Sequence, residues 1–144
     1  MKVGEILKAK GSRVATVRPD LTVETICHRL KMENVGALVV SEDDKTILGM
    51  ISERDIVQGL VAQGPALLDM RVDELMSLGV PTCQRDDSVT KAMEKMTRER
   101  VRYLPVLDDG RLCGIISIGD VVRVRLGETE LEASVLREAY RAAR

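Results

Sequence analysis

The chain has 144 residues, a formal net charge of −1 at pH 7, and neither phenylalanine nor tryptophan. A chain of this length buries about 68–70% of the surface that its unfolded state exposes, which is enough for one sizeable core. The near-neutral charge provides no basic field for nucleic acid or a membrane surface, and the scarcity of aromatic rings removes the stacking platforms used by single-stranded nucleic acid.

Cysteine usage and hydropathy indicate the compartment. Cys27, Cys83 and Cys113 are odd in number and far apart, which favours neither a disulfide framework nor a zinc site. Met1–Glu5 leads into mixed polar sequence rather than the apolar core of a signal peptide, and no apolar run reaches the ~20 residues of a membrane span. We therefore expect a cytoplasmic protein.

The chain then repeats itself, beginning with a short helix and an extended segment. Val3–Leu7 recurs as Val72–Met76, and both have the apolar spacing of a helical turn. Val14–Val17 recurs as Val80–Cys83. Because Pro81 cannot donate a ladder hydrogen bond, we expect an edge strand or a loop there.

Two amphipathic helices and two hairpins follow, one of each in either copy. Thr22 and Ser88 are the expected helix N-caps. The apolar stripes have the i, i+3, i+4, i+7 spacing of a core-facing helix and comprise Val23, Ile26, Cys27 and Leu30, and Val89, Ala92, Met93 and Met96. Strands at 37–40 and 103–107 each lead through a polar turn into another strand, which predicts the hairpins.

One phrase ends the second strand of both hairpins. Gly49–Asp55 reads Gly-Met-Ile-Ser-Glu-Arg-Asp, and Gly114–Asp120 reads Gly-Ile-Ile-Ser-Ile-Gly-Asp, at a constant offset (114 − 49 = 120 − 55 = 65). The phrase predicts a buried strand that turns into a helix, with Ser and Asp forming a capping box that contributes ~1 kcal/mol. It also suits a ligand, because a helix N-terminus attracts anions and a carboxylate accepts both hydrogen bonds of a ribose diol. Its repetition favours the ligand-binding interpretation.

The ends of the repeats set the expected boundaries. The helix after the first phrase should end near Gly64, and the one after the second near Gly127. Thr129 and Glu132 then form a capping box for a separate amphipathic helix, which could dock on its own domain or on a second subunit. The expected units are residues 1–64, 65–127 and 128–144.

Tandem units that each end in Gly-apolar-apolar-Ser-x-x-Asp resemble a pair of cystathionine β-synthase (CBS) domains, or Bateman module. The resemblance covers roughly Val3 to Leu126 and extends to small bacterial stand-alone proteins. It implies an α/β fold with two helix-strand-helix-strand-strand-helix repeats around a pseudo-twofold axis and two related clefts. It further implies a homodimeric sensor that reports to a partner protein, binds AMP, ADP, ATP, NAD(H) or S-adenosylmethionine as a regulatory ligand, and requires no cofactor.

The resemblance also implies roles for the residues of the repeated phrase. Asp55 and Asp120 would each hold a ribose diol, and Ser52 and Ser117 would bind ribose or phosphate oxygens. Arg54 would bind phosphate, since a planar guanidinium matches phosphate geometry. No nucleophile–base pair, metal cluster, Walker loop or dinucleotide fingerprint is visible, so we expect neither catalysis nor a metal site.

Further contacts follow from the same resemblance. Arg102 and Tyr103 would supply phosphate contacts in the second cleft, and Tyr103 replaces a histidine that is common in the subgroup. The segments that meet the base, largely through backbone atoms, would contain Thr16, Val17, Val80 and Thr82.

The two clefts should not be equivalent, because Glu53 and Arg54 in the first phrase correspond to Ile118 and Gly119 in the second. The implied dimer seam comprises Val3, Ile6, Leu7, Val72, Leu75, Met76, Val121 and Val122, flanked by Leu131, Leu136 and Tyr140. The alternative function is a structural or protein-interaction dimer without a nucleotide, whose active surface is the C-terminal helix.

Overall fold

Two three-stranded sheets form the centre of the computed structural model, which describes residues 1–11 and 14–143. In each sheet the first strand is parallel to the second, and the second and third form an antiparallel hairpin. The strands are β1 (Thr16–Val17), β2 (Ala37–Val40) and β3 (Gly49–Ser52), then β4 (Cys83–Gln84), β5 (Tyr103–Asp108) and β6 (Arg111–Ser117). Both predicted hairpins are confirmed, as is the mixed α/β class with two tandem repeats.

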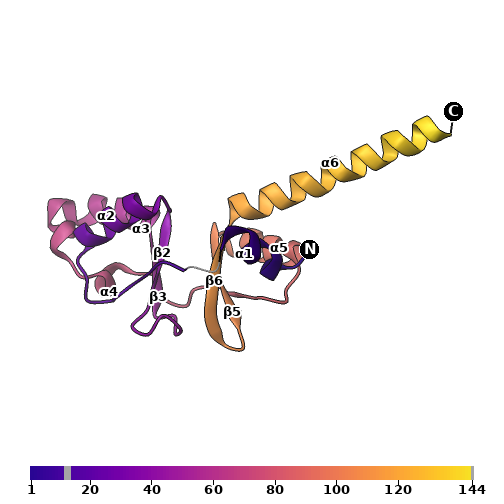
Figure 1. Ribbon diagram of the computed structural model, residues 1–144. Helices are drawn as coiled ribbons and strands as arrows, with labels where there is room; N and C mark the ends of the chain where they lie inside the picture. Colours follow the sequence, from indigo (N-terminus) through magenta and orange to yellow (C-terminus); the bar gives the residue numbers. More distant parts are fainter. Residues whose placement is uncertain (12–13, 144) are drawn as a thin grey trace.

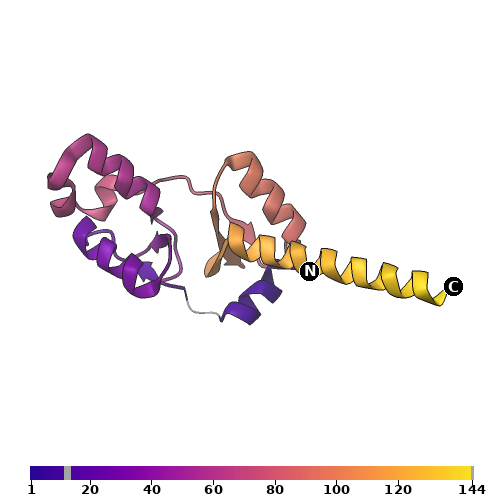
Figure 2. The ribbon, with the colours of Figure 1, turned by 90° about the horizontal axis from the view of Figure 1, so that it is seen from above.

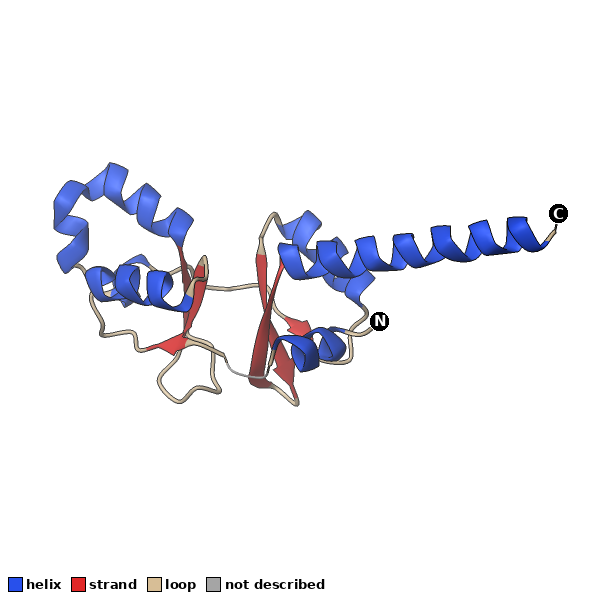
Figure 3. Ribbon diagram, turned by 45° about the horizontal axis from the view of Figure 1, so that its top comes forward, coloured by secondary structure: helices blue, strands red, loops and turns tan. Residues whose placement is uncertain are grey.

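The sheets face each other, and helices cover their outer faces (Figures 1 and 3). The principal helices are α2 (Val23–Glu33), α3 (Glu53–Gln63), α5 (Val89–Glu99) and α6 (Ile118–Ala142). The predicted N-caps are confirmed, because the hydroxyl oxygens of Thr22 and Ser88 accept hydrogen bonds from backbone N–H groups three residues ahead. The predicted stripes are buried at Ile26 and Leu30 and at their counterparts Ala92 and Met96. A separate apolar cluster lies between the sheets and joins the two halves.

Two short helices are exchanged between the halves. Helix α1 (Val3–Lys10) precedes the first sheet in the chain but packs in the core of the second half, where Leu7 contacts β6. Helix α4 (Val72–Leu75) follows the 3₁₀ helix η1 (Gly64–Asp69) and packs in the core of the first half. Figure 1 shows α1 beside β6 and α4 near β3. Each half therefore completes its core with a helix that belongs, by sequence order, to the other.

This exchange overturns most of the expected dimer seam. Val3, Ile6, Leu7, Val72 and Val121 are at most 5% exposed and belong to the cores of their own chain, so they are not available to a second subunit. Of the expected residues, Val122 and the flanking Leu131, Leu136 and Tyr140 are exposed, and the largest groups of exposed apolar side chains lie on α3 and α6. On α3 they are Val57, Leu60 and Val61, and on α6 they are Ile118, Val122, Leu126, Leu131, Val135, Leu136 and Tyr140.

Helix α6 runs without a break from Ile118 to Ala142. The predicted helix end at Gly127 and the capping box at Thr129 are both wrong, because the Thr129 hydroxyl donates to the Arg125 carbonyl oxygen one turn earlier, at 2.9 Å. A helical glycine costs about 1 kcal/mol relative to alanine, which the good helix formers around Gly127 offset. The C-terminal part of α6 projects beyond the rest of the molecule (Figures 1 and 2). Within the described residues, no helix is apolar over a length that could cross a membrane.

Candidate functional site

Both copies of the repeated phrase form the predicted strand-to-helix turn. Ser52 accepts a hydrogen bond from the backbone N–H of Asp55 at 3.2 Å, and Asp55 Oδ2 accepts one from the backbone N–H of Ser52 at 2.9 Å. Ser117 and Asp120 repeat this pair of bonds at 3.2 and 2.8 Å. The capping interpretation is confirmed in both repeats. The difference between the repeats lies in what surrounds the remaining carboxylate oxygen.

Asp55 opens onto a cleft of about 770 Å³ between the two halves. The first half contributes Gly36, Ala37 and Met50 besides the β3–α3 turn, and the second half contributes the α5–β5 turn. The linker contributes Ser77, Leu78, Val80 and Pro81. Of the residues predicted from the sequence, the cleft contains Ser52, Arg54, Asp55, Val80, Arg102 and Tyr103. We call this the first cleft. Its volume lies within the range of about 300–1,000 Å³ that is usual for small-molecule sites.

One oxygen of the Asp55 carboxylate faces this first cleft with a single partner among the described residues. The Ser77 hydroxyl donates to Asp55 Oδ1 at 3.2 Å. Ser77 is exposed, so this weak contact competes with water and can be replaced by a ligand hydroxyl. Asp55 thus has the acceptor capacity for a diol.

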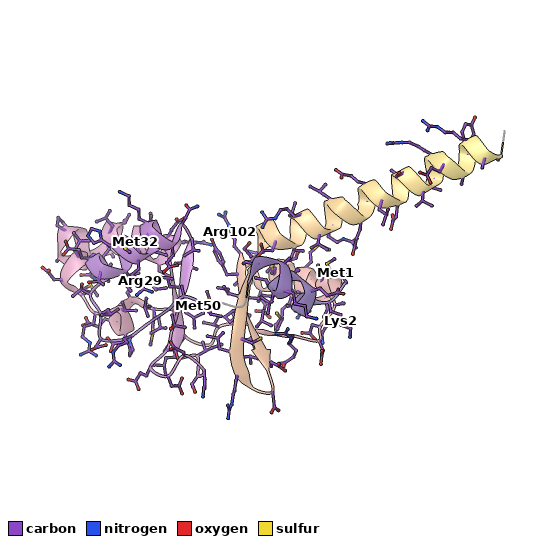
Figure 4. The ribbon with its side chains drawn as sticks, in the orientation of Figure 1. Met1, Lys2, Arg29, Met32, Met50 and Arg102 are labelled. Atoms are coloured by element: carbon purple, nitrogen blue, oxygen red, sulfur yellow. The ribbon has the colours of Figure 1, made fainter. Side chains whose placement is uncertain are left out.

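Three arginines lie around the same cleft, and all are exposed: Arg54 from α3, and Arg100 and Arg102 from the α5–β5 turn. Within residues 1–11 and 14–143, none of their guanidinium groups forms an ion pair or a hydrogen bond. Figure 4 shows Arg102 at the junction of the two halves. The family resemblance implies that Arg102 and Tyr103 belong to the second cleft. That grouping is wrong, because the first cleft combines the phrase of one repeat with the α5–β5 turn of the other.

The other carboxylate, Asp120, is enclosed by cations from its own chain. Its residue is 4% exposed, Lys10 Nζ donates to Oδ2 at 2.8 Å, and an Arg123 guanidinium nitrogen donates to Oδ1 at 2.6 Å. Lys10 Nζ also donates to the Ile115 carbonyl oxygen at 3.1 Å, which fixes the ammonium group against β6. Burial raises the pKa of the Asp120 carboxyl, but the hydrogen bonds from Lys10 and Ser117 outweigh it and hold the pKa below its ordinary value. Both oxygens are therefore occupied.

The remaining predicted residues lie apart from the first cleft. Val17 is buried in the first core at 2% exposure, so only its backbone could meet a ligand. The Thr16 hydroxyl donates to Asp44 in the first hairpin turn. Thr82 lines a smaller hollow of about 350 Å³ beside the hairpin turns, and its carbonyl oxygen accepts a hydrogen bond from Lys95.

Among the residues of the first cleft that sequence reasoning missed are Gly36, Ser77 and Arg100. A side chain at Gly36 would collide with the Tyr103 hydroxyl, so glycine is required for Tyr103 to lie there. Ser77 follows α4, outside the repeated phrase. Arg100 could have been found by repeat alignment, since it corresponds to Asn34 (100 − 34 = 66, the offset of the two helices).

The thiols show no sign of activation. Burial raises the pKa of Cys83 to about 12, and burial also raises the pKa values of Cys27 and Cys113. Within the described part of the chain, no cluster of three or more His, Cys, Asp or Glu side chains could hold a metal ion.

Comparison with known proteins identifies the class. The profile of the CBS domain matches residues 3–62 and 72–127, so the chain belongs to the CBS domain family and contains a tandem pair of these regulatory modules. The CBS-domain containing protein ATU1752 from Agrobacterium tumefaciens is 41% identical with a TM-score of 0.83, covering 87% of this chain and 99% of that one.

Two further relatives are informative. The CBS domain-containing protein YhcV of Bacillus subtilis is 34% identical over 110 residues, which are 76% of this chain and 77% of that protein. The CBS domain protein PAE2072 from Pyrobaculum aerophilum, solved in complex with AMP, is 26% identical with a TM-score of 0.74 and covers 83% of this chain and 89% of that one.

Proposed function

We propose that this protein is a sensor that binds one adenosine-containing ligand per chain in the first cleft. The observation that carries the proposal is the difference between the two aspartates: Asp55 has an oxygen open to a cleft of about 770 Å³, whereas both oxygens of Asp120 are held by Lys10, Arg123 and Ser117. The AMP complex of PAE2072, a relative with the same fold, supports an adenosine ligand.

The walls of the first cleft suit the parts of such a ligand. The ribose diol donates to Asp55 and displaces the Ser77 hydroxyl. The adenine ring lies against apolar side chains at the base of the cleft, chiefly Ala37, Met50 and Val80. The phosphate groups face the arginines. Because both halves contribute, the bound ligand stabilises one arrangement of the halves over others, and that is a signal a partner protein can read.

The second cleft, around Ser117 and Asp120, binds a ligand only if Lys10 leaves. Lys10 ends α1 and its side chain is about a third exposed, so it can be displaced, but the displacement costs two hydrogen bonds. By family resemblance, Thr16, Val17 and Thr82 would meet the base of a bound ligand, as Val80 would in the first cleft.

We further propose a homodimer built on α3 and α6. Val57 and Val61 on α3 occupy the same positions as Val122 and Leu126 on α6 (122 − 57 = 126 − 61 = 65), and all four are more than 45% exposed. Two equivalent apolar faces on one protomer suit a twofold partner. Light scattering tests this: a mass near 15.9 kDa contradicts it, and twice that mass supports it.

Three unpaired thiols support a cytoplasmic location for this protein. A sensor of this kind is not itself an enzyme.

Thermal unfolding tests the ligand. At a hundred times its dissociation constant, a bound nucleotide adds about 2.7 kcal/mol, which shifts the melting temperature by roughly 5–10 °C for a chain of this size. Millimolar AMP, ATP, NAD and S-adenosylmethionine are each added to the wild type and to Asp55→Asn, which retains a capping side chain. A shift in the wild type that Asp55→Asn loses supports the proposal. No shift with any of the four contradicts it and favours the alternative, an interaction dimer whose exposed apolar α6 is the active surface.

A further inference from the structure

Arg100 stands in a backbone conformation that arginine disfavours. It follows the last residue of α5 with φ 55° and ψ 43°, in the left-handed region, and its N–H caps the helix by donating to Met96. The equivalent residue after α2 is Asn34, with φ 53° and ψ 48° and the same capping bond to Leu30. Asparagine tolerates this conformation, whereas a long side chain with a Cβ costs of order 1 kcal/mol there. The second repeat carries this strain at the edge of the first cleft.

In this conformation, Arg100 lies where its side chain can contact a ligand in the first cleft. Its side chain lines the first cleft together with Arg54 and Arg102, so that guanidinium groups from both halves border one cavity. Two acidic residues, Glu53 and Asp55, line the cavity together with the three arginines. Asp55 is already engaged by backbone and hydroxyl donors of the capping box. The border of the cleft therefore carries net positive charge.

The guanidinium groups are also available. In the part of the chain that the structure describes, Arg54, Arg100 and Arg102 have no acidic partner, whereas Lys10 and Arg123 around Asp120 are both paired. Unpaired arginines that converge on a cavity favour a ligand with several anionic oxygens, because each planar fork matches two of them. The cleft, at about 770 Å³, has room for a ligand longer than a nucleoside.

We infer that the ligand of the first cleft is a nucleoside polyphosphate, and that Arg100 is a specificity-determining residue that selects the phosphate chain. This inference rests on the proposed adenosine site and narrows its ligand class. The guanidinium groups of Arg54, Arg100 and Arg102 together hold the phosphate chain, one from the first half and two from the second. A cationic sulfonium group in the same place meets three like charges and is disfavoured.

Calorimetric titrations with adenosine, AMP, ADP and ATP test the inference, on the wild type, Arg100→Asn and Arg98→Asn. Asparagine is the residue that the first repeat uses in this conformation, so Arg100→Asn folds with an unchanged or higher melting temperature. Arg98 is the matched control: an arginine two residues away that pairs with Glu99 and does not line the cleft. Arg100→Lys retains the charge but loses the planar fork.

In the wild type, affinity should rise from adenosine to ATP by about a hundredfold in total and should fall with added salt. Arg100→Asn should lower ATP affinity about tenfold and leave adenosine affinity unchanged, with Arg100→Lys between the two and Arg98→Asn like the wild type. If adenosine binds but added phosphates bring no gain, or if Arg100→Asn leaves the ATP-to-adenosine ratio unchanged, the inference is wrong and the adenosine site stands. If neither adenosine nor any nucleotide binds, both proposals are wrong.

Discussion

The two repeats contain the same Ser-x-x-Asp phrase in the same strand-to-helix turn, yet their carboxylates differ in availability. Asp55 Oδ1 faces an open cleft with one weak hydroxyl contact, whereas Asp120 is buried against an ammonium group and a guanidinium group of its own chain. The difference arises outside the phrase, from Ser77 after α4 and from Lys10 at the end of α1. The residues that end or follow the exchanged helices thus make the two copies of a duplicated motif unequal, and under the proposed function only the first copy binds a ligand. Three predictions test this difference between the repeats, and a fourth compares the helices that follow the two phrases, in order of decreasing effect.

The largest effect should be on nucleotide affinity. Asp55→Asn removes the carboxylate that accepts the ribose hydroxyls but retains a capping side chain, and it should weaken ATP binding by ~1.5–3 kcal/mol, which is about 10- to 150-fold. Asp120→Asn should leave the affinity unchanged, because Lys10 already occupies its oxygens. Equilibrium dialysis with labelled ATP measures both. A loss in Asp120→Asn with Asp55→Asn intact would reverse the assignment of the clefts.

The effects on stability should run the other way. Asp120→Asn replaces the buried carboxylate shared by Lys10 and Arg123 with a neutral amide and should cost about 2 kcal/mol, a value reduced from the range for buried pairs because both cations are more than a third exposed. Asp55→Asn should cost less than ~1 kcal/mol without ligand, since capping survives. Urea unfolding of the two variants without nucleotide gives the comparison. Equal losses would mean that the Lys10 contact contributes nothing.

Low pH should remove the contribution of the Asp120 carboxylate to folding stability. The folded pKa of Asp120 is depressed, so its contribution to stability is complete above the unfolded pKa of about 4 and is lost as the pH falls through the folded value. Between pH 5 and pH 3 the wild type should therefore lose more stability than Asp120→Asn does. Urea midpoints at several pH values follow the loss. Parallel curves for the two proteins would show that Asp120 is not the responsible group.

The smallest expected effects are those of alanine substitutions at Gly64, which ends α3, and at Gly127, which lies within α6. Gly64 ends α3 with φ 63°, where an alanine is strained, whereas Gly127 lies inside α6, where an added Cβ meets nothing within 4 Å. Gly64→Ala should therefore cost about 1 kcal/mol, and Gly127→Ala should stabilise the chain by about 0.5–1 kcal/mol. The melting temperatures of the two variants show whether each substitution stabilises or destabilises the chain. A destabilising Gly127→Ala would indicate that α6 bends or ends at this residue in solution.

Local signals predicted the local structure well. The stripe of Val23, Ile26 and Leu30, the N-caps at Thr22 and Ser88, and both hairpins follow from periodicity and turn chemistry within a dozen residues, and the structure confirms them. The same kind of signal predicted a helix end at Gly127, and that prediction is wrong. The helix propensity of the neighbouring residues outweighs the cost of the glycine and the capping-box pattern, so α6 continues through this position.

The candidate site could be predicted only in part. The family resemblance and the repeat identified Asp55 and Arg54, but the contact of Lys10 with Asp120 joins residues 110 apart in the chain and depends on how α1 crosses to the other half. The prediction of a dimer seam at Val3 and Val72 is wrong for the same reason. Val3 packs in the core of the second half and Val72 in the core of the first, so neither side chain is exposed to a partner. Apolar periodicity shows which side of a helix is buried, but not against which partner.

The number of nucleotides bound per chain tests the central claim most directly. Isothermal titration of ATP into the wild-type protein should give one equivalent per chain, and Lys10→Met, which removes the ammonium contact of Asp120 and leaves only the exposed Arg123 to be displaced, should raise that number toward two. Two equivalents in the wild type, or one equivalent that Asp55→Asn retains, would contradict the account.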